Sequence, residues 1–559
     1  MKFDELVTIL GEFGPYQKRV YFLLCLPAIT GCMQTLVYVF TMGVPQHRCA
    51  LPGLEQDTYE PQNPHHAAVV NASIPPNDFC HVIVKTLNVT SLTTTAELAA
   101  GSMNGVHGFA GSAYNSSDGS NKQESDCDDG LHINSTGSGC KLATCSRYVF
   151  DKSNFQETVV TQMGLVCEKR NNLAHAQMLF MLGSLFATAV CQPLSDIYGR
   201  KAILLACLAL HAIVSLAITW STYFTLLCAL MFLSNLAITG MFGNAFVIGI
   251  ELVGPSKRVW AGYVVEIFWS LGMILLAPIA FLLRDWQHLQ MATSILPFGF
   301  LSYYWLIPES PRWLLSRGRI HEAETIIRTA AKVNKVTLPA GVLDAMSLAV
   351  EKRESVLGVC RHPVLVFRCV VIFYSCLAFY GLALNVGHLS GNIYLNFFLT
   401  GITELAVYGL CLGLLDRVGR RLLNSGLMLV AGVSCTLTVF TVLYASASMQ
   451  WITTALAMVG RMGIAGGFAT IYLYTSELYP TVVRNSAMGA SSFFARIGSV
   501  ISPYIANLST MIGGDVGTAA PLLIFGLSSI LAGCLLLTLP ETLNRRLPET
   551  VDDAVSFAG

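Results

Sequence analysis

Four ionisable side chains fall inside long apolar stretches of this chain, and they are the residues most able to do chemistry. They are Glu266, Glu404, Arg461 and Arg496, and their neighbours are mostly apolar or small. A charge at the centre of a bilayer costs ~2.5–3.5 kcal/mol on insertion scales, so such groups face an interior or a water-filled path and mark ion or substrate sites. Two acids and two bases can also form two buried ion pairs. The sequence leaves the binding and the structural interpretation open.

Arg496 gives the most specific chemical expectation of the four. It lies in Ala495-Arg-Ile-Gly-Ser499, where the small residues let helices approach closely. A guanidinium binds a carboxylate through two parallel hydrogen bonds. An arginine and a glutamate that face one cavity, such as Arg496 and Glu404, would suit a zwitterion, but they would also suit each other.

Aromatic side chains at membrane depth could surround a quaternary or amine group through cation–π contacts. The candidates are Tyr38, Trp269, Phe379, Tyr380, Tyr472 and Tyr474. Neighbours on a helix point about 100° apart, so these rings cannot all line one cavity. Packing against lipid or core is the alternative for each of them. Gln34 and Asn244 are polar mid-span residues that could donate or accept hydrogen bonds.

Several function classes leave no pattern in the chain. There is no P-loop, no nucleophile elbow and no metal-ligand cluster, so the sequence predicts no enzyme, cofactor or metal site. The formal net charge of +0 argues against a nucleic-acid partner, since such proteins carry a basic surplus. Energy for any transport must then come from a gradient. The coupling ion stays open between Na⁺ and H⁺, with Glu266 and Glu404 as the candidates for carrying a proton.

Composition indicates a membrane protein that positions these groups on helices. The 559 residues are 53% hydrophobic and only 12% charged, with a mean hydropathy of +0.56, whereas soluble domains average about 25% charged residues. A spanning helix needs about 20 apolar residues. No cleavable signal peptide precedes the first run. Twelve spans are predicted, at 20–42, 173–194, 202–220, 223–249, 258–283, 288–307, 364–384, 392–414, 422–444, 450–475, 484–510 and 518–539.

The polar stretch 308–363 divides the spans into two six-helix halves, 20–307 and 364–539. A lead-in (1–19) and a tail (540–559) flank them, and 308–363 reads as a helical linker with an amphipathic helix near 320–332. Lys and Arg gather in the loops on one side, which predicts that both termini are cytoplasmic.

The long stretch 43–172 is expected to be an extracellular, glycosylated loop. It holds six cysteines, which allow up to three disulfides in fifteen connectivities: Cys49, Cys80, Cys127, Cys140, Cys145 and Cys167. It also holds four glycosylation sequons, at Asn71, Asn88, Asn115 and Asn134. Its six histidines show no metal-ligand spacing and are expected to be solvated.

Charged turns repeat between the two halves. Asp196 and Arg200 are four residues apart, so they can pair on one helix face, and Asp416 and Arg420 repeat them 220 residues later. Glu251 with Arg258 after span four has its counterpart in Glu477 with Arg484 after span ten. Pro308-Glu-Ser310 is likewise matched by Pro540-Glu-Thr542.

At these motifs the chain resembles the organic cation, carnitine and anion transporter family of the major facilitator superfamily. The resemblance covers essentially the whole chain, and it rests on motifs at 11–17, 195–201, 308–314 and 477–481 together with the cysteine-bearing first loop. The lead-in resembles invertebrate organic cation transporters most. One departure is that Ala187 and Gln192 stand where the family usually has glycines, so packing of span two against span eleven is expected to differ.

The resemblance implies a secondary transporter of small organic ions in the plasma membrane, such as organic cations, carnitine or betaines, working by alternating access. In the family an arginine at the position of Arg496 goes with the anion and carnitine branches, whereas cation carriers have an acid there. The gating hypothesis is that the eight turn charges form salt bridges between the halves when the protein faces outward. The alternatives are a potential-driven organic cation uniporter, an organic anion carrier, a sugar porter or a non-transporting receptor. The exact substrate and the oligomeric state stay open.

Overall fold

The structure is a computed structural model of the whole chain. It describes residues 3–51, 57–75, 79–85, 140–337, 392–444, 449–479, 484–508 and 514–543, with single positions elsewhere, among them 377–380. Residues Pro45–Ser153 form one compact unit, and the remainder of the chain forms another, the membrane unit. The stretch 154–172, the last part of the predicted extracellular loop, packs with the membrane unit.

The first half of the membrane unit is helical, as predicted. Its first span begins at Pro15, where proline suits the first helical position, rather than near Val20. The helices at its six predicted spans are α2 (Pro15–Leu36) with α3 (Tyr38–Thr41), α6 (Asn171–Tyr198), α7 (Arg200–Ile218), α8 (Phe224–Leu252), α9 (Arg258–Leu282) and α10 (Trp286–Gly299) with η4 (Phe300–Ser302) and α11 (Tyr303–Leu306). Two short elements, α5 (Val159–Met163) and η2 (Cys167–Lys169), precede α6, and η3 (Pro255–Lys257) precedes α9.

The second half repeats this plan. Its helices are α16 (Ile393–Val418), α17 (Arg420–Tyr444), α18 (Gln450–Leu478), α19 (Arg484–Ala506) and α21 (Gly514–Leu537). Most of predicted span seven lies outside the described residues. Within the described part of the chain, nine helices are long and apolar enough to cross a membrane.

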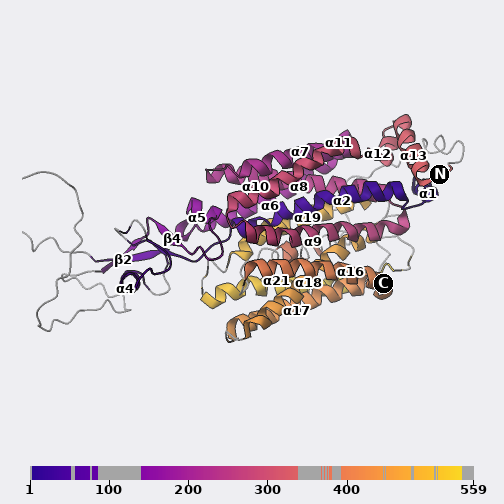
Figure 1. Cartoon of the computed structure of the whole chain (residues 1–559). Helices are drawn as coiled ribbons and strands as arrows, with labels where there is room; N and C mark the ends of the chain where they lie inside the picture. Colours follow the sequence, from indigo (N-terminus) through magenta and orange to yellow (C-terminus); the bar gives the residue numbers. More distant parts are fainter. Residues whose placement is uncertain are drawn as a thin grey trace, which may run out of the picture. The chain divides into compact units, whose positions relative to one another are not determined.

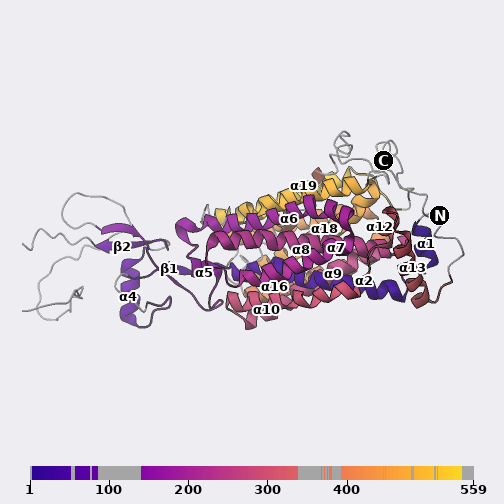
Figure 2. The same cartoon turned by 90° about the horizontal axis from the view of Figure 1, so that it is seen from above.

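Helices of each half pack mainly on one another, and two pairs of helices make most of the contact between the halves. In the first half α2 packs on α9, and α8 packs on α6 and α7; in the second half α17 packs on α18 and α21. Between the halves, α9 packs on α16 and α6 packs on α19. Figure 1 shows the helices running side by side, and Figure 2 shows yellow α19 lying along magenta α6.

Glycine turns end two helices in equivalent places. Gly199 joins α6 to α7 and Gly419 joins α16 to α17, with φ of 112° and 96°, a region that favours glycine. We call the end of the bundle that holds Gly199 and Gly419 the turn end. The other end, which holds Thr41, Asn171 and Ala506, is called the opposite end.

The N-terminal lead-in is bound to the first half at the turn end. Leu6 of helix α1 (Phe3–Ile9), and Leu10 directly after that helix, pack with α12 (Pro311–Ser316) and α13 (Ile320–Asn334) in one apolar cluster. Asn334 donates from Nδ2 to the carbonyl of Leu10 at 2.8 Å and to Gln17 at 2.7 Å. The amphipathic helix predicted near 320–332 is thus confirmed as α13, and it braces the lead-in.

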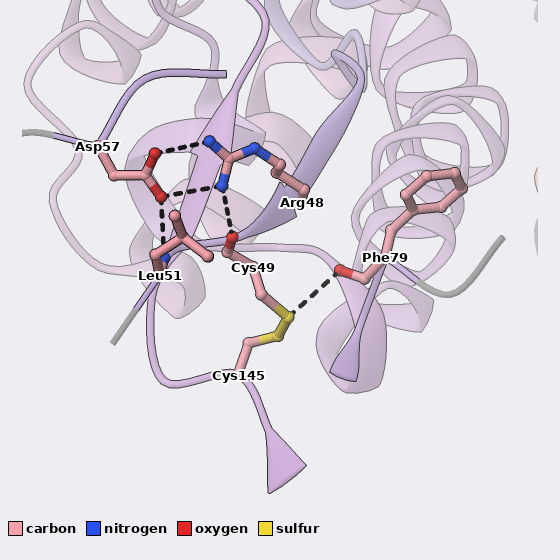
Figure 3. Close-up of a disulfide and its surroundings, with 6 residues drawn as sticks. All are labelled: Arg48, Cys49, Leu51, Asp57, Phe79 and Cys145. Carbon is pink, nitrogen blue, oxygen red and sulfur yellow. Dashed lines mark hydrogen bonds and ion pairs between the residues drawn. A yellow bond between two sulfur atoms is a disulfide. The ribbon is translucent and has the colours of Figure 1, made fainter. Parts of the chain in front are cut away.

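The Pro45–Ser153 unit contains two small antiparallel sheets. Strand β1 (His47–Cys49) pairs with β4 (Tyr148–Phe150), and β2 (His81–Lys85) pairs with β3 (Cys140–Thr144). A disulfide joins Cys49 to Cys145 (Figure 3). Cys80 of this unit is disulfide-bonded as well, and so is Cys167 of the membrane unit. Cys127 and the side chain of Cys140 lie outside the described residues.

A buried ion pair holds the segment after β1. Arg48 donates to both carboxylate oxygens of Asp57, at 2.9 and 2.6 Å, and their side chains are 6% and 0% exposed (Figure 3). Burial by itself would raise the pKa of Asp57, but hydrogen bonds from Arg48, the Leu51 amide and His66 lower it below its ordinary value.

His66 corrects the expectation that all loop histidines are solvated. Its side chain is buried, and Nε2 lies 3.0 Å from Asp57 Oδ1. Asn63 caps helix α4 (Pro64–Ser73) by accepting from the His66 amide, so the capped helix places His66 beside the carboxylate. The sequon at Asn71 lies exposed on the same helix, whereas Asn88, Asn115 and Asn134 lie outside the described residues.

Candidate functional site

A buried ion pair between α16 and α18 lies at the centre of the second half. Arg461 donates from Nη2 to Glu404 Oε1 at 2.5 Å, and the two side chains are 4% and 0% exposed. Arg461 also donates from Nη1 to the carbonyl of Phe379 at 2.9 Å. Two of the four ionisable residues predicted from the sequence are therefore brought together, as the structural interpretation expects for them.

Aromatic rings surround this pair and extend to Arg496. The Arg461 guanidinium lies 4.6 Å from the ring centroid of Phe379, which stacks on Phe468 at 4.2 Å. Arg496 is half-buried on α19, and its Nη1 donates to the Tyr380 hydroxyl at 2.5 Å. Tyr472 packs edge-on against Phe468 with centroids 5.2 Å apart. The predicted residues Phe379, Tyr380 and Tyr472 thus form one aromatic cluster with the two arginines.

Glu266 on α9 is the fourth ionisable residue, and its surroundings differ. It is half-buried, and the carboxylates of Glu266 and Glu404 lie close enough to repel each other. Among the described residues, no hydrogen bond or ion pair is made to Glu266. Cys32 on α2 and Tyr408 on α16 lie within electrostatic range of both carboxylates. The two halves therefore meet at a cluster of two acids and one base.

The other candidates named from the sequence lie elsewhere in the bundle. Trp269 packs edge-on against Phe242 at 5.6 Å, and Tyr38 packs edge-on against Phe180 at 4.8 Å. Tyr474 donates to the carbonyl of Pro540 at 2.5 Å, so it anchors the end of α21 rather than lining a site.

The two polar mid-span residues of the first half also have structural surroundings. Gln34 is held in a buried network in which its Nε2 donates to Thr293 at 2.9 Å and its Oε1 accepts from Gln290 at 2.9 Å. Asn244 donates to the carbonyl of Gly240 at 2.7 Å.

A charged cluster follows the glycine turn of the first half. Arg200 is 6% exposed and lies 2.6 Å from Asp196 and 3.7 Å from Glu251. Ser310 donates its hydroxyl to Glu251, and Glu309 accepts the backbone N–H of Lys201 at 3.1 Å. The cluster therefore ties α6, α7 and α8 to the start of α12.

The second half repeats this cluster residue by residue. Arg420 is 8% exposed and lies 3.2 Å from Asp416 and 3.3 Å from Glu477. Thr542 donates to Glu477 at 2.5 Å, and Glu541 accepts the backbone N–H of Arg420 at 2.9 Å. Burial by itself would raise the pKa of Glu541, but four backbone N–H groups that donate to it lower it below its ordinary value.

These contacts revise part of the sequence-based gating hypothesis. The Asp196–Arg200 and Asp416–Arg420 pairs form as their spacing predicts. The predicted partner of Glu251 is Arg258, at the start of α9, whereas the partners described are Arg200 and Ser310. The side chain of Arg484, the predicted partner of Glu477, lies outside the described residues. Each pair named here joins residues of one half, because the buried arginine after each glycine turn is neutralised by acids of its own half.

At the opposite end of the bundle the two halves touch directly. Phe40 of α3 stacks on Tyr394 at 5.4 Å and meets Phe397 edge-on at 4.9 Å. His175 of α6 is hydrogen-bonded to the Tyr504 hydroxyl at 2.8 Å. Near it, Asn507, just after the end of α19, donates to Gln177 of α6 at 2.9 Å. These contacts hold the halves together at this end.

Several residues of the central cluster are absent from the sequence-based candidates. Phe468 lies four residues before Tyr472 and so shares its helix face, which is a signal that could have identified it. Tyr408 lies four residues after Glu404 for the same reason. Cys32 reads as an ordinary apolar residue, and only the packing of α2 on α9 places it near the acids.

The comparisons with known proteins agree with this architecture. Residues 147–553 match the family model described as "Sugar (and other) transporter". Two relatives are an "Organic cation transporter protein" of Drosophila melanogaster (37% identical; 100% of this chain and 95% of that one) and an "Organic cation/carnitine transporter 2" of Mus musculus (30%; 100% and 94%).

Solved structures show the same fold at low identity. The inward-open xylose transporter XylE from E. coli has a TM-score of 0.55 at 15% identity, and the match covers 70% of this chain and 90% of that one. The relatives are transporters rather than enzymes. The chain thus belongs to the organic cation, carnitine and anion transporter family, within the major facilitator superfamily.

Proposed function

We propose that this protein carries small organic cations and zwitterions across the plasma membrane by alternating access between its two halves. The relatives named above support the class of substrate through their names, which refer to organic cations and carnitine. The Lys- and Arg-rich loops at the turn end support placing that end, with both termini, in the cytoplasm.

The proposed substrate class rests on one observation: the four charged residues inside the predicted spans differ in the partners that they bind. Arg461 and Glu404 neutralise each other, whereas Glu266 is half-buried and makes no hydrogen bond or ion pair among the described residues. A carboxylate at this depth is a ready site for an ammonium group. Arg496 is half-buried and donates to the Tyr380 hydroxyl. A guanidinium can bind a carboxylate through two parallel N–H groups. We assign the ammonium group to Glu266 and a substrate carboxylate to Arg496.

The contacts between the halves at the opposite end suit a state that is closed to the outside. In such a state the turn charges are expected to bind within their own half, and the proposed pairs between the halves would form when the protein faces outward.

The test compares choline with glycine betaine, which share a quaternary ammonium and differ in the carboxylate. Uptake is measured in cells that express the wild type, Arg496→Ala or the control Arg328→Ala. Arg328 is exposed on α13 and pairs only with nearby Glu324 in the contacts named here. A hydrogen-bonded charge pair contributes about 1.5–3 kcal/mol, so Arg496→Ala should lower betaine uptake about ten- to a hundred-fold and leave choline uptake within about two-fold.

If Arg496→Ala lowers both uptakes equally at matched surface expression, then Arg496 is structural and the carboxylate assignment is wrong. If neither compound enters cells with the wild type, the proposed substrate class is wrong.

A further inference from the structure

One face of α2 carries an arginine followed by three apolar residues. Arg19, Phe22, Leu23 and Leu26 stand at positions i, i+3, i+4 and i+7, so they lie along one side of the helix. At a rise of 1.5 Å per residue, the first and the last are about 10 Å apart along the helix axis. Because α2 begins at the turn end, Arg19 lies nearest that end and Leu26 lies deeper in the spanning part of the helix.

These four residues line a groove on the surface of the first half. The groove has a volume of about 330 Å³, and Phe268 of α9 and Leu306 of α11 complete its walls. The ring centroids of Phe22 and Phe268 are 6.1 Å apart, so α2 and α9 share one aromatic wall. On the other side the Tyr303 hydroxyl donates to the carbonyl of Leu23, which holds the start of α11 against α2. Contacts within one half therefore fix the shape of the groove.

The walls of the groove are apolar and open to the outside of the bundle. Phe22 is 40% exposed and Leu306 is 42% exposed. Exposed apolar surface that forms a groove marks a place where another molecule binds. On a helix that spans a membrane, the molecule that reaches such a groove from outside the bundle is a lipid.

Arg19 gives the end of the groove nearest the turn end a positive charge. Arg19 is exposed, and its side chain forms no ion pair or hydrogen bond among the described residues. The next cation, Lys18, lies 5.8 Å from the ring centroid of Phe13, and no acid lines the groove. We assign this end to the cytoplasm, and the cytoplasmic leaflet is the one that holds anionic lipids. The charge is thus complementary to an anionic headgroup at the level where one would lie.

We propose that this groove binds one anionic phospholipid of the cytoplasmic leaflet. Arg19 donates charge-assisted hydrogen bonds to the phosphate, and an acyl chain lies along Phe22 and Leu26. The inference rests on the membrane orientation given under the proposed function and not on the substrate. Since α9 also packs on α16, the bound lipid contacts one of the helices at which the two halves meet.

The experiment measures lipid binding to the full chain, purified in detergent, by native mass spectrometry. Phosphatidylglycerol and phosphatidylcholine with the same acyl chains are titrated separately, and the dissociation constants of the first bound lipid are compared. One basic side chain near anionic lipid changes binding about five-fold, so the wild type should bind phosphatidylglycerol at least about five-fold more tightly than phosphatidylcholine.

Three variants locate the bound lipid. Arg19→Gln should weaken phosphatidylglycerol binding about five-fold and leave phosphatidylcholine binding within about two-fold. Leu26→Trp fills the apolar end of the groove and should weaken the binding of both lipids. The control Arg417→Gln removes another exposed arginine at the turn end, on α16, and should bind both lipids like the wild type. Arg19 is exposed, so its variant tests the proposal even if Leu26→Trp does not fold.

Equal affinity of the wild type for the two lipids would overturn the preference for an anionic headgroup. Equal losses in Arg19→Gln and Arg417→Gln would show a general attraction to basic residues and would overturn the site, as would unchanged binding by folded Leu26→Trp. None of these results depends on transport. Absence of uptake of both choline and glycine betaine would overturn the proposed substrate class and leave the lipid site standing.

Discussion

Among the described charged residues at membrane depth, some form an ion pair with each other and others do not. Glu404 and Arg461 are nearly completely buried and paired, and Arg461 is also held by a backbone carbonyl. Sequence reasoning identified all four charged residues because a charge in an apolar run is conspicuous. It could not assign the pairs, since pairing depends on which helices pack together and on how each is rotated.

The buried pair predicts an asymmetry between single and double variants. Removing one partner leaves an uncompensated buried charge and costs about 3–5 kcal/mol, whereas replacing both by apolar groups is often neutral. Glu404→Leu should therefore lower the thermal unfolding midpoint of the purified protein in detergent more than Glu404→Leu with Arg461→Met. If the double variant loses as much as the two single variants added together, the pair is not coupled in this way.

The charged turns repeat between the two halves, and the sequence motifs predicted only part of this repeat. The spacing of Asp196 and Arg200, and of Asp416 and Arg420, predicted two ion pairs that form. The roles of Glu309 and Glu541 were not predicted, because each binds the backbone of a helix start more than 100 residues away in the sequence. In both halves these acids lie against the glycine of the turn.

This arrangement predicts which glycines of the second half tolerate a side chain. A Cβ at Gly419 would lie 2.6 Å from Glu541 Oε2, and the residue has a positive φ. Gly419→Ala should destabilise the protein and reduce its amount at the cell surface. The matched control is Gly413→Ala on α16, where a Cβ meets nothing within 4 Å and alanine favours the helix by about 1 kcal/mol. Equal surface amounts for the two variants would contradict the proposed packing.

The overall fold was the feature that the sequence predicted most completely. Twelve apolar runs, two charged turns and one long polar loop predicted the transporter fold that the comparisons show. The sequence predicted a single loop over 43–172 and no division within it. In the structure residues 154–172 pack with the membrane unit, through contacts such as the hydrogen bond from Tyr394 to the Asn154 carbonyl. Polarity indicates that a segment lies outside the bilayer, but it does not indicate which unit of the protein the segment packs on.

Contacts at the opposite end predict how the equilibrium between states can be shifted. His175→Ala with Asn507→Ala removes two hydrogen bonds between the halves, each contributing about 1 kcal/mol. The outward-open state should gain population. A cysteine at Gly262, near the turn-end start of α9 where an added Cβ meets no atom within 4 Å, should then react more slowly with an impermeant thiol reagent from the cytoplasmic side. Unchanged labelling, relative to Gly262→Cys alone, would show that these bonds do not hold that end closed.

The Arg48–Asp57 ion pair in the Pro45–Ser153 unit also determines how stable this segment is at acidic pH. The lowered pKa of Asp57 means that its stabilising contribution is complete above the unfolded value of about 3.9 and is lost only as the pH falls through the still lower folded value. Acidic endosomes, at about pH 5–6, lie above that window. A carrier that cycles between the cell surface and these compartments would keep this segment folded and resistant to lumenal proteases, whereas Asp57→Asn should shorten its lifetime there.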